Sequence, residues 1–313
     1  MNRLLVVRLS AFGDVIHTIP AVVALRRALP TTEIAWAVEP AYQELVEIVA
    51  RVKVIAAPLK RWGRNALSSR GEMRALAKQL RTFARGQTAI DFQGLAKSAL
   101  VTRVSGASRR FGFHPHSARE RISTWLTNRH VRIEPGEHVV DWNLRLARGV
   151  APNIDASPAI DFSPFASDPS GELARFEDRI ILLPAAGRPE KQWPVDRFRE
   201  LAERLGERAL VAWGPGERGL AEQVGAEIAP GTTFRELAYL LKRASLVIGG
   251  DTGPLHLAAA LGTPIIGLYG PTDPRRNGPY GQLERVVESF GSTRSMDSIS
   301  VDAVFEKIGN IIE

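Results

Sequence analysis

The sequence predicts an α/β fold of two doubly wound domains that face each other across a cleft. Short apolar runs alternate with longer amphipathic segments along the whole chain, which is typical of strand–helix–strand units. The 313 residues are more than one hydrophobic core usually serves. The alternation breaks once, in a stretch over 151–171 that is rich in Pro, Ala, Ser and Asp. We therefore expect one domain over 1–160 and a second over 161–313.

The elements of the first domain follow from hydrophobic spacing. Short apolar runs predict strands, and apolar residues three and four positions apart predict helices. The predicted strands cover 4–9, 33–38, 87–92 and 109–113. The predicted helices cover 15–29, 71–84, 95–105 and 139–150. Strands that alternate with helices in this way pair in parallel.

The same pattern restarts after the linker. The predicted strands cover 179–184, 209–214, 245–250 and 264–270. The predicted helices cover 195–206, 218–228, 234–244, 254–262 and 301–312. We expect the last helix to pack back toward the first domain. Ligands of doubly wound sheets bind beyond the carboxyl ends of the strands, so the cleft between the domains is the expected site.

Composition excludes several classes of protein. The chain has no cysteine, which excludes disulfides, thiolate metal sites and a thiol nucleophile and suits a reducing cytoplasm. The N-terminus lacks a secretory signature, and no run of about 18 apolar residues predicts a transmembrane helix. We expect a soluble protein, and attachment to a membrane surface stays open.

The positive charge is concentrated in the first half of the chain. Residues 1–160 hold 24 Lys and Arg against 12 Asp and Glu. The rest of the chain holds 17 Lys and Arg against 22 Asp and Glu, and the whole chain has a net charge of +7. The first half therefore suits an anionic partner, either nucleic acid, an anionic membrane surface or a multiply charged substrate. A merely soluble basic surface is the simpler alternative. The pI of about 10.0 favours nucleic acid, but the basic half has no recognised nucleic-acid motif, so we expect no such partner.

The most specific motif is GGDTGPLHLAAALGTPIIGLYGPTDP, over 249–274. A strand ends, Asp251 follows, and the backbone N–H groups of Thr252 and Gly253 precede a helix. Such a helix start can hold a phosphate. Asp251 is itself an anion, so we expect it to accept hydrogen bonds from sugar hydroxyls, with His256 facing the same ligand. The alternative is a helix-capping Asp251 and a packed His256.

Two further loops of the second domain follow predicted strands. In LLPAAGRPEKQWP the small residues Ala186 and Gly187 let a ligand approach the backbone, and Lys191 offers a compact positive charge for a diphosphate. Glu217 follows the next strand in VAWGPGERGLAE. It is either a ligand for ribose hydroxyls or a favourable charge in a first helical turn.

In the first domain Asp14 raises a similar choice. It lies in LSAFGDVIHTIP, where the first strand passes into a helix. An Asp at a helix start commonly caps it, whereas a carboxylate at the end of a strand can also be catalytic. The local sequence leaves both roles open for Asp14.

Six polar residues of the first domain are candidates for contacts with an anionic acceptor: Lys60, Arg61, Arg64, Gln93, Lys97 and Arg119. Gln93, Lys97 and Arg119 converge only if their loops lie on one side of the sheet. Trp62, among the basic residues 60–64, either enters a membrane interface or packs.

Four segments together resemble the lipopolysaccharide heptosyltransferases of Gram-negative bacteria, in glycosyltransferase family 9: LVVRLSAFGDVIHTIPAVVALRRALP, DFQGLAKSAL, EKQWP and GDTGPLHLAAALGTPIIGLYGPTDP. The resemblance implies the GT-B fold, with two Rossmann-like domains. It also implies an inverting transfer of L-glycero-D-manno-heptose from ADP-heptose to the first Kdo of Kdo2-lipid A. DFQGLAKSA and ARE look like the type I enzymes, and a type II enzyme or a family member with another acceptor stays open.

The resemblance also assigns roles to residues. The general base falls on Asp14, and the lysine that stabilises the departing ADP falls on Lys191. Donor contacts fall on Ala186, Gly187, Lys191, Glu217, Thr232, Asp251, Thr252, Gly253 and His256. Relatives with a hydroxyl pair at the first two positions contact phosphate there, so backbone N–H groups must serve here. The expected partners are ADP-heptose, Kdo2-lipid A and the anionic cytoplasmic face of the inner membrane, where the protein is peripheral, and no cofactor or metal is expected.

Overall fold

The computed structural model describes residues 1–62, 68–134, 136–289 and 294–312. The chain divides into two compact units, Met1–Asp161 and Phe162–Glu313. The division lies inside the stretch 151–171 that is rich in Pro, Ala, Ser and Asp.

The first unit is built on a six-stranded parallel sheet. Its strands are β1 (Arg3–Val7), β2 (Glu33–Val38), β3 (Lys53–Ala56), β4 (Thr88–Asp91), β5 (Arg109–Phe113) and β6 (Arg129–Val131). They lie in the order β3-β2-β1-β4-β5-β6. In the register, Leu5 of β1 is opposite Ala35 of β2 on one side and Ala89 of β4 on the other. The central strands are almost entirely apolar because both faces of the sheet are covered.

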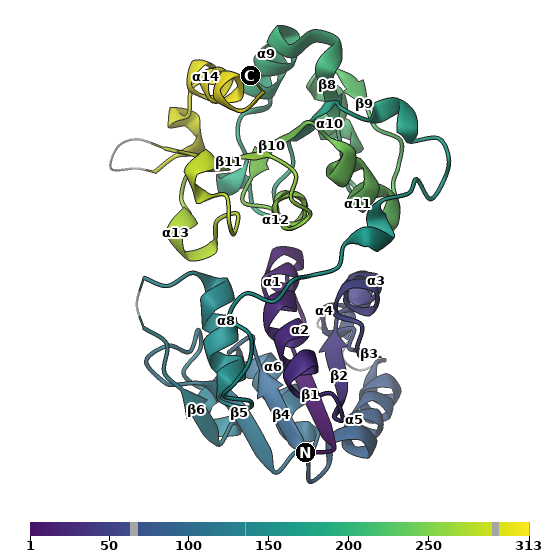
Figure 1. The fold of residues 1–313 in the computed structure, drawn as a ribbon, viewed down its shortest axis with the longest axis vertical. Coiled ribbons are helices and arrows are strands. Elements are labelled where there is room, and N and C mark those ends of the chain that lie inside the picture. Colours follow the sequence, from purple (N-terminus) through teal and green to yellow (C-terminus); the bar gives the residue numbers. More distant parts are fainter. Residues whose placement is uncertain (63–67, 135, 290–293, 313) are drawn as a thin grey trace. The chain divides into compact units, whose positions relative to one another are not determined.

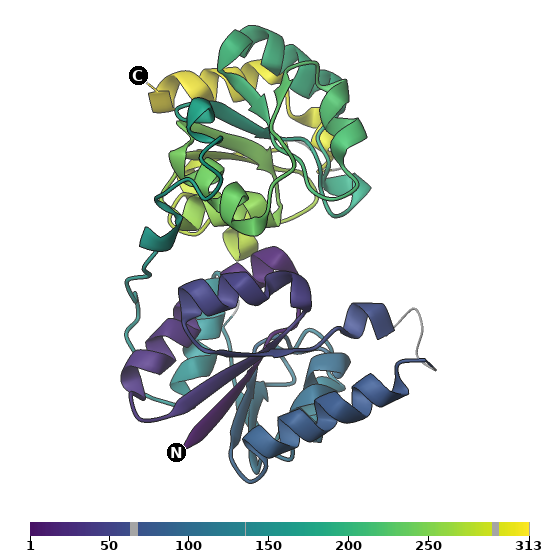
Figure 2. The ribbon, with the colours of Figure 1, turned by 90° about the vertical axis from the view of Figure 1, so that its right-hand side faces the viewer.

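Helices cover both faces of this sheet. They are α1 (Phe12–Ile16), α2 (Ile19–Ala28), α3 (Gln43–Leu45), α4 (Leu59–Trp62), α5 (Arg70–Ala84), α6 (Ala96–Val104), α7 (Ser123–Leu126) and α8 (Val139–Arg148). Helices α2 and α8 pack together, as Figure 1 shows. Helices α5 and α6 bury their apolar side chains with those of β1, β2 and β3, on the other side of the sheet (Figure 2).

The helix predicted over 15–29 is two helices, α1 and α2, separated at His17 and Thr18. Pro20 lies in the first turn of α2, where its missing N–H costs nothing, but its ring disfavours a continuous helix through the preceding turn. The amide of Asn143 on α8 donates a hydrogen bond to the carbonyl oxygen of His17 at 2.9 Å, which satisfies a backbone group at the break.

The second unit has the same strand order. Its strands are β7 (Ile180–Leu183), β8 (Ala209–Val211), β9 (Glu227–Ile228), β10 (Leu246–Gly250), β11 (Ile265–Tyr269) and β12 (Val286–Glu288). They lie in the order β12-β11-β10-β7-β8-β9, and each neighbouring pair is parallel. Counted along each unit, both sheets have the order 3-2-1-4-5-6 of dinucleotide-binding folds.

The helices of the second unit are α9 (Val195–Leu205), α10 (Arg218–Gln223), α11 (Phe234–Arg243), α12 (Gly253–Ala260), α13 (Pro274–Asn277) and α14 (Val301–Ile312). Helices α9, α10 and α14 contribute to one core, and α11 packs on α12. The buried face of α14, with Val301, Val304 and Ile308, lies in this core. One face of α14 is thus packed within the second unit, and its packing toward the first domain stays a prediction.

The helix predicted over 218–228 is shorter than expected. Helix α10 ends at Gln223, and Glu227 and Ile228 form β9. Gly225 has a φ of +80°, a left-handed conformation that ends helices and that glycine adopts without strain. This prediction was wrong because the glycine stops the helix before the apolar pattern does.

The eight predicted strands are all present, as β1, β2, β4, β5, β7, β8, β10 and β11. Within the described ranges of the chain, no helix combines the length and the hydropathy that crossing a bilayer requires.

Candidate functional site

The second unit brings two of the predicted site residues into direct contact. Lys191 ends the turn Pro189–Lys191 after β7, and Asp251 directly follows β10. These two strands pair with each other, and the strand order reverses between them, which is where doubly wound sheets bind ligands. Lys191 Nζ lies 2.6 Å from Asp251 Oδ2. Gly250 permits this approach, since a Cβ there would lie 2.8 Å from the carbonyl oxygen of Lys191.

Two more side chains donate to the Asp251 carboxylate. His256 Nε2 lies 3.0 Å from Oδ1, and Asn277 Nδ2 lies 3.1 Å from Oδ2. Burial of the Asp251 carboxyl favours its neutral form and by itself would raise the pKa. The hydrogen bond and charge of His256, followed by those of Lys191, have the opposite effect and are stronger. Together they lower the pKa of Asp251 to about 2. Asp251 is therefore ionised, and Nε2 of His256 carries the proton that it donates. Asp251 holds Lys191, His256 and Asn277 in place.

Helix α12 begins beside this cluster. Thr252, not Asp251, is its N-cap residue, so the capping alternative for Asp251 is wrong. Thr252 has an extended backbone and makes no side-chain capping bond. Its Oγ1 is buried and has no hydrogen-bond partner among the residues that the structure describes. With the backbone N–H of Gly253, which no helical carbonyl satisfies, this end of α12 offers donors to an anion.

The other predicted donor residues follow neighbouring strands at the same edge of the sheet. Ala186 is half-buried and Gly187 exposed in the loop after β7. Glu217 precedes α10, and its Oε2 accepts a hydrogen bond from the backbone N–H of Gly214 at 2.8 Å. Thr232 is half-buried in the loop between β9 and α11. Because all these strands are parallel, their carboxyl ends meet at one edge.

In the first unit Asp14 lies in α1, after β1. Its Oδ1 is 2.6 Å from a guanidinium nitrogen of Arg8, and its Oδ2 accepts a long hydrogen bond of 3.3 Å from the backbone N–H of Ala11, the N-cap residue. The Arg8 side chain is 5% exposed and that of Asp14 is 29% exposed. Arg8 also donates to the carbonyl oxygen of Phe92. Asp14 thus supports the helix start and still presents its carboxylate to solvent.

Asp91, at the end of β4, was not among the candidates from the sequence. Its Oδ1 accepts from the backbone N–H groups of Gln93 at 2.8 Å and Gly94 at 3.2 Å, and Ser98 Oγ lies 3.0 Å from Oδ2. Burial raises the pKa of Asp91 to about 6, although these hydrogen bonds and the charge of Arg8 act in the opposite direction. A carboxylate at the last position but one of a predicted strand, 87–92, was the signal that could have identified it.

The candidate acceptor residues near Asp91 differ in exposure. Gln93 is only 4% exposed, and its Oε1 accepts from the backbone N–H of Leu9 at 2.9 Å. Its observed contacts therefore hold the end of β1. Lys97 and Arg119 are exposed.

The loops of Lys97 and Arg119 lie side by side. The backbone N–H of Glu120 donates to the carbonyl oxygen of Gly94 at 3.0 Å, and the Glu120 carboxylate accepts from the backbone N–H of Ala96 at 2.7 Å. These two bonds join the start of α6 to the segment before α7. The segments of Lys97 and Arg119 therefore lie side by side, which is the condition for these two side chains to converge.

The remaining basic candidates lie on and after α4. Lys60 is exposed, and Arg61 pairs with Glu72. Trp62 is 7% exposed and donates from its indole nitrogen to Glu72 at 2.7 Å, so it packs in the unit instead of entering a membrane interface. Arg64 lies outside the described residues.

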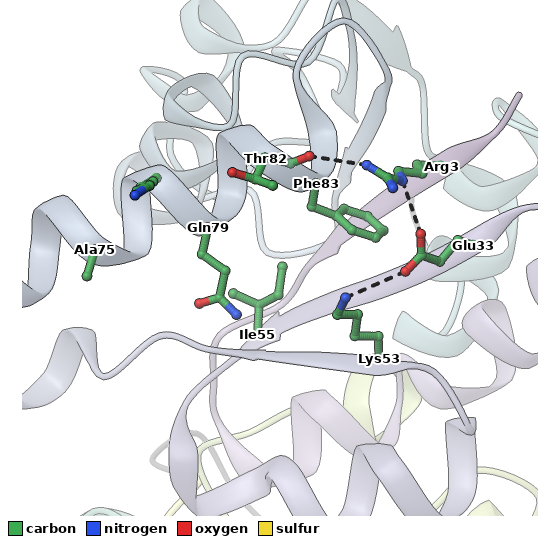
Figure 3. A pocket seen from close by; sticks show the side chains of 9 residues that line it. Arg3, Glu33, Lys53, Ile55, Ala75, Gln79, Thr82 and Phe83 are labelled. Carbon is green, nitrogen blue, oxygen red and sulfur yellow. Dashed lines mark hydrogen bonds and ion pairs between the residues drawn. The ribbon is translucent and has the colours of Figure 1, made fainter.

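A hollow of about 360 Å³ lies at the amino ends of β1, β2 and β3 (Figure 3). Arg3 and Lys53 both flank the ring of Phe83, and both contact Glu33, at 3.0 and 3.6 Å. Glu33 is thus paired with two of the cations that line the hollow, and the hollow lies at the edge of the sheet opposite Asp14 and Asp91. We therefore do not assign the reaction to this hollow.

Among the described residues, no three His, Cys, Asp or Glu side chains are grouped as metal ligands.

Comparison with known proteins gives a consistent result. The profile of "Glycosyltransferase family 9 (heptosyltransferase)" matches residues 73–304. Lipopolysaccharide heptosyltransferase 1 of Escherichia coli K12 is 32% identical over 99% of this chain and 100% of its own length. The enzyme of that name from Pseudomonas aeruginosa is 32% identical over 90% of this chain and 82% of its own.

Solved structures agree with these relatives. The E. coli heptosyltransferase WaaC with ADP superposes with a TM-score of 0.85 at 28% identity, over 98% of this chain and 99% of that chain. E. coli ADP-heptose LPS heptosyltransferase II, at 20% identity and a TM-score of 0.77 over 100% and 98% of the two chains, supports the fold alone. The predicted α/β fold of GT-B type is confirmed.

Proposed function

Since the chain belongs to glycosyltransferase family 9 and is a glycosyltransferase, we propose that it transfers L-glycero-D-manno-heptose from ADP-heptose to the first Kdo of Kdo2-lipid A. The names of the similar proteins support the donor, because one solved relative is WaaC with ADP-2-deoxy-2-fluoro heptose, at a TM-score of 0.83 and 28% identity. The lipopolysaccharide heptosyltransferase 1 relatives support the acceptor class.

One observation in the chain itself carries the proposal. Each unit holds an ion pair where its strand order reverses, and the more exposed partner has opposite charge in the two units. In the first unit the exposed partner is a carboxylate, Asp14, and in the second it is an ammonium group, Lys191. A glycosyl transfer that inverts configuration needs a base for the acceptor and a positive charge for the departing diphosphate.

On the donor side, Lys191 and the start of α12 bind the diphosphate of ADP-heptose. The unpartnered hydroxyl of Thr252 and the backbone N–H of Gly253 supply hydrogen bonds, and the helix terminus favours negative charge. Ala186 and Gly187 contribute backbone N–H groups, whereas Glu217 and Thr232 contact the nucleoside. Asp251 orients Lys191 and His256, the remaining N–H groups of Lys191 act on the diphosphate, and His256 faces the same ligand.

On the acceptor side, Asp14 takes the proton of the Kdo hydroxyl. As this proton leaves, the hydroxyl oxygen bonds to the anomeric carbon of the heptose. The bond from that carbon to the β-phosphate oxygen breaks, and ADP departs with the electron pair. Lys97 and Arg119, with Lys60 and Arg61, suit the Kdo carboxylates and lipid A phosphates, since guanidinium groups match such oxygens.

The protein is proposed to work at the cytoplasmic face of the inner membrane, where a lipid-borne acceptor is held. The surplus of Lys and Arg in the first half of the chain suits that anionic surface. The reaction as written uses no metal, because Lys191 and the start of α12 neutralise the leaving group.

The direct test mixes the purified protein with ADP-heptose and Kdo2-lipid A and measures ADP release and the product mass. Release of ADP with addition of one heptose is the expected result. No release with this acceptor, but release with another lipopolysaccharide core acceptor, would favour the alternative of a type II enzyme or another member of family 9. Replacing ADP-heptose by other nucleotide sugars tests the donor in the same way.

A further inference from the structure

The three most exposed large apolar side chains of the described residues lie close together in the fold. They are Trp125, 81% exposed, Leu100, 54% exposed, and Ile122, 49% exposed. Leu100 is on α6, Trp125 is on α7, and Ile122 caps α7. The two helices pack against each other. A tryptophan this exposed leaves a large apolar surface in water.

Spacing places Leu100 on the exposed side of α6, and Ile122 and Trp125 on the exposed side of α7. Leu100 lies three residues from Lys97 and three from Arg103 on α6, and all three are exposed. Ile122 and Trp125 are likewise three residues apart. Residues at this spacing project from the same side of a helix. The surface therefore combines apolar side chains with basic ones.

The same segment carries a large positive charge. Residues 96–132 contain eight Lys or Arg and one acidic residue, Glu120, a balance of +7. The whole chain has a net charge of +7. Glu120 is itself bound to the backbone N–H of Ala96. The apolar cluster thus lies in a strongly positive part of the chain.

We infer that the outward faces of α6 and α7, with Leu100, Ile122 and Trp125 and the flanking Arg103 and Arg121, dock on an anionic lipid bilayer. Tryptophan is favoured at the boundary between headgroups and hydrocarbon. Lys and Arg are attracted to anionic headgroups. Apolar insertion or electrostatic attraction alone gives weak attachment to a bilayer, whereas the two together give stable attachment. A second copy of the chain fits this surface poorly, since it would bring two segments of +7 together.

This inference rests on the proposed function in one respect: a lipid-borne acceptor explains why the surface is next to Lys97 and Arg119. Binding to a bilayer itself requires no donor and no transfer. The two proposals can therefore fail separately.

The test measures sedimentation of the full-length protein with vesicles made of equal parts phosphatidylcholine and phosphatidylglycerol. Trp125→Ala should weaken vesicle binding about tenfold or more, because a large apolar surface no longer enters the interface. The matched control is Phe305→Ala, which removes an exposed aromatic side chain of α14, 40% exposed, and should bind as the unchanged protein does. Since both side chains are exposed, thermal unfolding should not distinguish the variants from the parent.

Fluorescence gives an independent measure. Tryptophan emission should shift to shorter wavelength when vesicles are added, and Trp125→Phe should bind within a few-fold of the parent while losing this shift. The double variant Arg103→Glu with Arg121→Glu should weaken binding by about fivefold or more for each charge. Arg208→Glu, an exposed cation of the second unit, is its control. Pure phosphatidylcholine vesicles should bind the parent poorly.

Activity separates the docking surface from the reaction. With Kdo2-lipid A in vesicles, Trp125→Ala should raise the KM for the acceptor, and with a deacylated Kdo disaccharide its turnover should match the parent. The inference is overturned if Trp125→Ala and Phe305→Ala bind vesicles equally, or if neutral vesicles bind the parent as well as anionic ones. Loss of a dimer in Trp125→Ala, without an effect on vesicle binding, would instead assign the surface to a second copy. An absence of transfer to either acceptor would refute the proposed function and leave the vesicle result to stand.

Discussion

Each unit has an ion pair where its strand order reverses, and the two units differ in which partner of that pair is buried. In the first unit the cation is buried, since Arg8 is 5% exposed, and Asp14 at 29% is the more accessible partner. In the second unit the carboxylate is buried, since Asp251 is 7% exposed, and Lys191 at 22% is the more accessible partner. The two sheets have one strand order, so the same fold presents a negative group in one unit and a positive group in the other.

The two buried carboxyl groups at these points also differ. Asp251 meets two potentially cationic side chains, and the pKa is lowered to about 2 despite burial. Asp91 is bonded mainly to backbone N–H groups and a hydroxyl, and burial raises its pKa to about 6. Burial alone therefore does not decide the charge of an aspartate; the side chains that the fold brings to it do.

The largest effect should come from removing the accessible carboxylate of the first unit. Asp14→Asn keeps the shape of the side chain but removes its basicity, so kcat should fall by about 10²- to 10⁴-fold with the affinity for ADP-heptose nearly unchanged. Steady-state ADP release and donor titration by calorimetry measure the two quantities. Glu47→Gln, an exposed carboxylate of the same unit, is the control. If Asp14→Asn kept most of its turnover, the base would have to be sought elsewhere.

The second prediction concerns Asp91 and the pH dependence of stability. Its pKa is raised from 3.8 to about 6 in the folded protein, so the folded state binds more protons and stability falls as pH rises through about 6. The loss is about 3 kcal/mol. Asp91→Asn can donate to Ser98 and accept from Gln93 as the neutral acid does, and it does not ionise. Its free energy of unfolding relative to the parent should therefore rise by about this amount between pH 4 and pH 8. Urea unfolding at the two pH values tests this, and a constant difference between the proteins would contradict it.

Removing the accessible cation of the second unit should have the next largest effect. Lys191→Ala removes a charged partner of the diphosphate and should weaken donor binding about tenfold to a hundredfold, with a further loss in turnover. Arg188→Ala, which removes an exposed cation three residues away that pairs with Glu190, should change donor binding little. If Lys191→Ala and the parent bound ADP-heptose with equal affinity, Lys191 would not contact the phosphates.

A smaller effect is expected from the hydroxyl at the start of α12. Thr252→Ala should weaken ADP-heptose binding about tenfold, because a hydrogen bond from a neutral hydroxyl to the charged diphosphate is lost. The free energy of unfolding should not decrease measurably through lost hydrogen bonding, because Oγ1 has no partner among the described residues. Thr252→Ser retains the hydroxyl and should bind the donor as the parent does. If both variants bound equally well, the hydroxyl would not contact the donor.

No effect is expected from a chelator. With leaving-group charge neutralised by Lys191 and the start of α12, initial rates in EDTA should equal those without it. A rate that fell in EDTA and returned with added Mg²⁺ would show that a metal replaces part of this role.

The sequence by itself determined the interior strands and the order of the motifs. Strands β1, β2, β4, β5, β7, β8, β10 and β11 were predicted, and most of them are continuous apolar runs because neighbours and helices cover them. The four strands that were not predicted, β3, β6, β9 and β12, are the edges of the two sheets. Edge strands are short and partly exposed, and they carry charges such as Lys53, Arg129 and Glu227, so the apolar signal is absent.

The sequence also placed Asp14, Lys191 and Asp251 at strand ends, because the end of an apolar run can be found without knowing the fold. Their partners were decided only by the tertiary structure. Lys191 and Asp251 are 60 residues apart, and Asn277 lies 26 residues beyond Asp251. Local sequence has no information on such contacts. Parallel pairing of β10 with β7 brings Lys191 to Asp251, and pairing of β10 with β11 brings the segment of Asn277 beside it. The charge of Lys191 then helps His256 to keep Asp251 ionised.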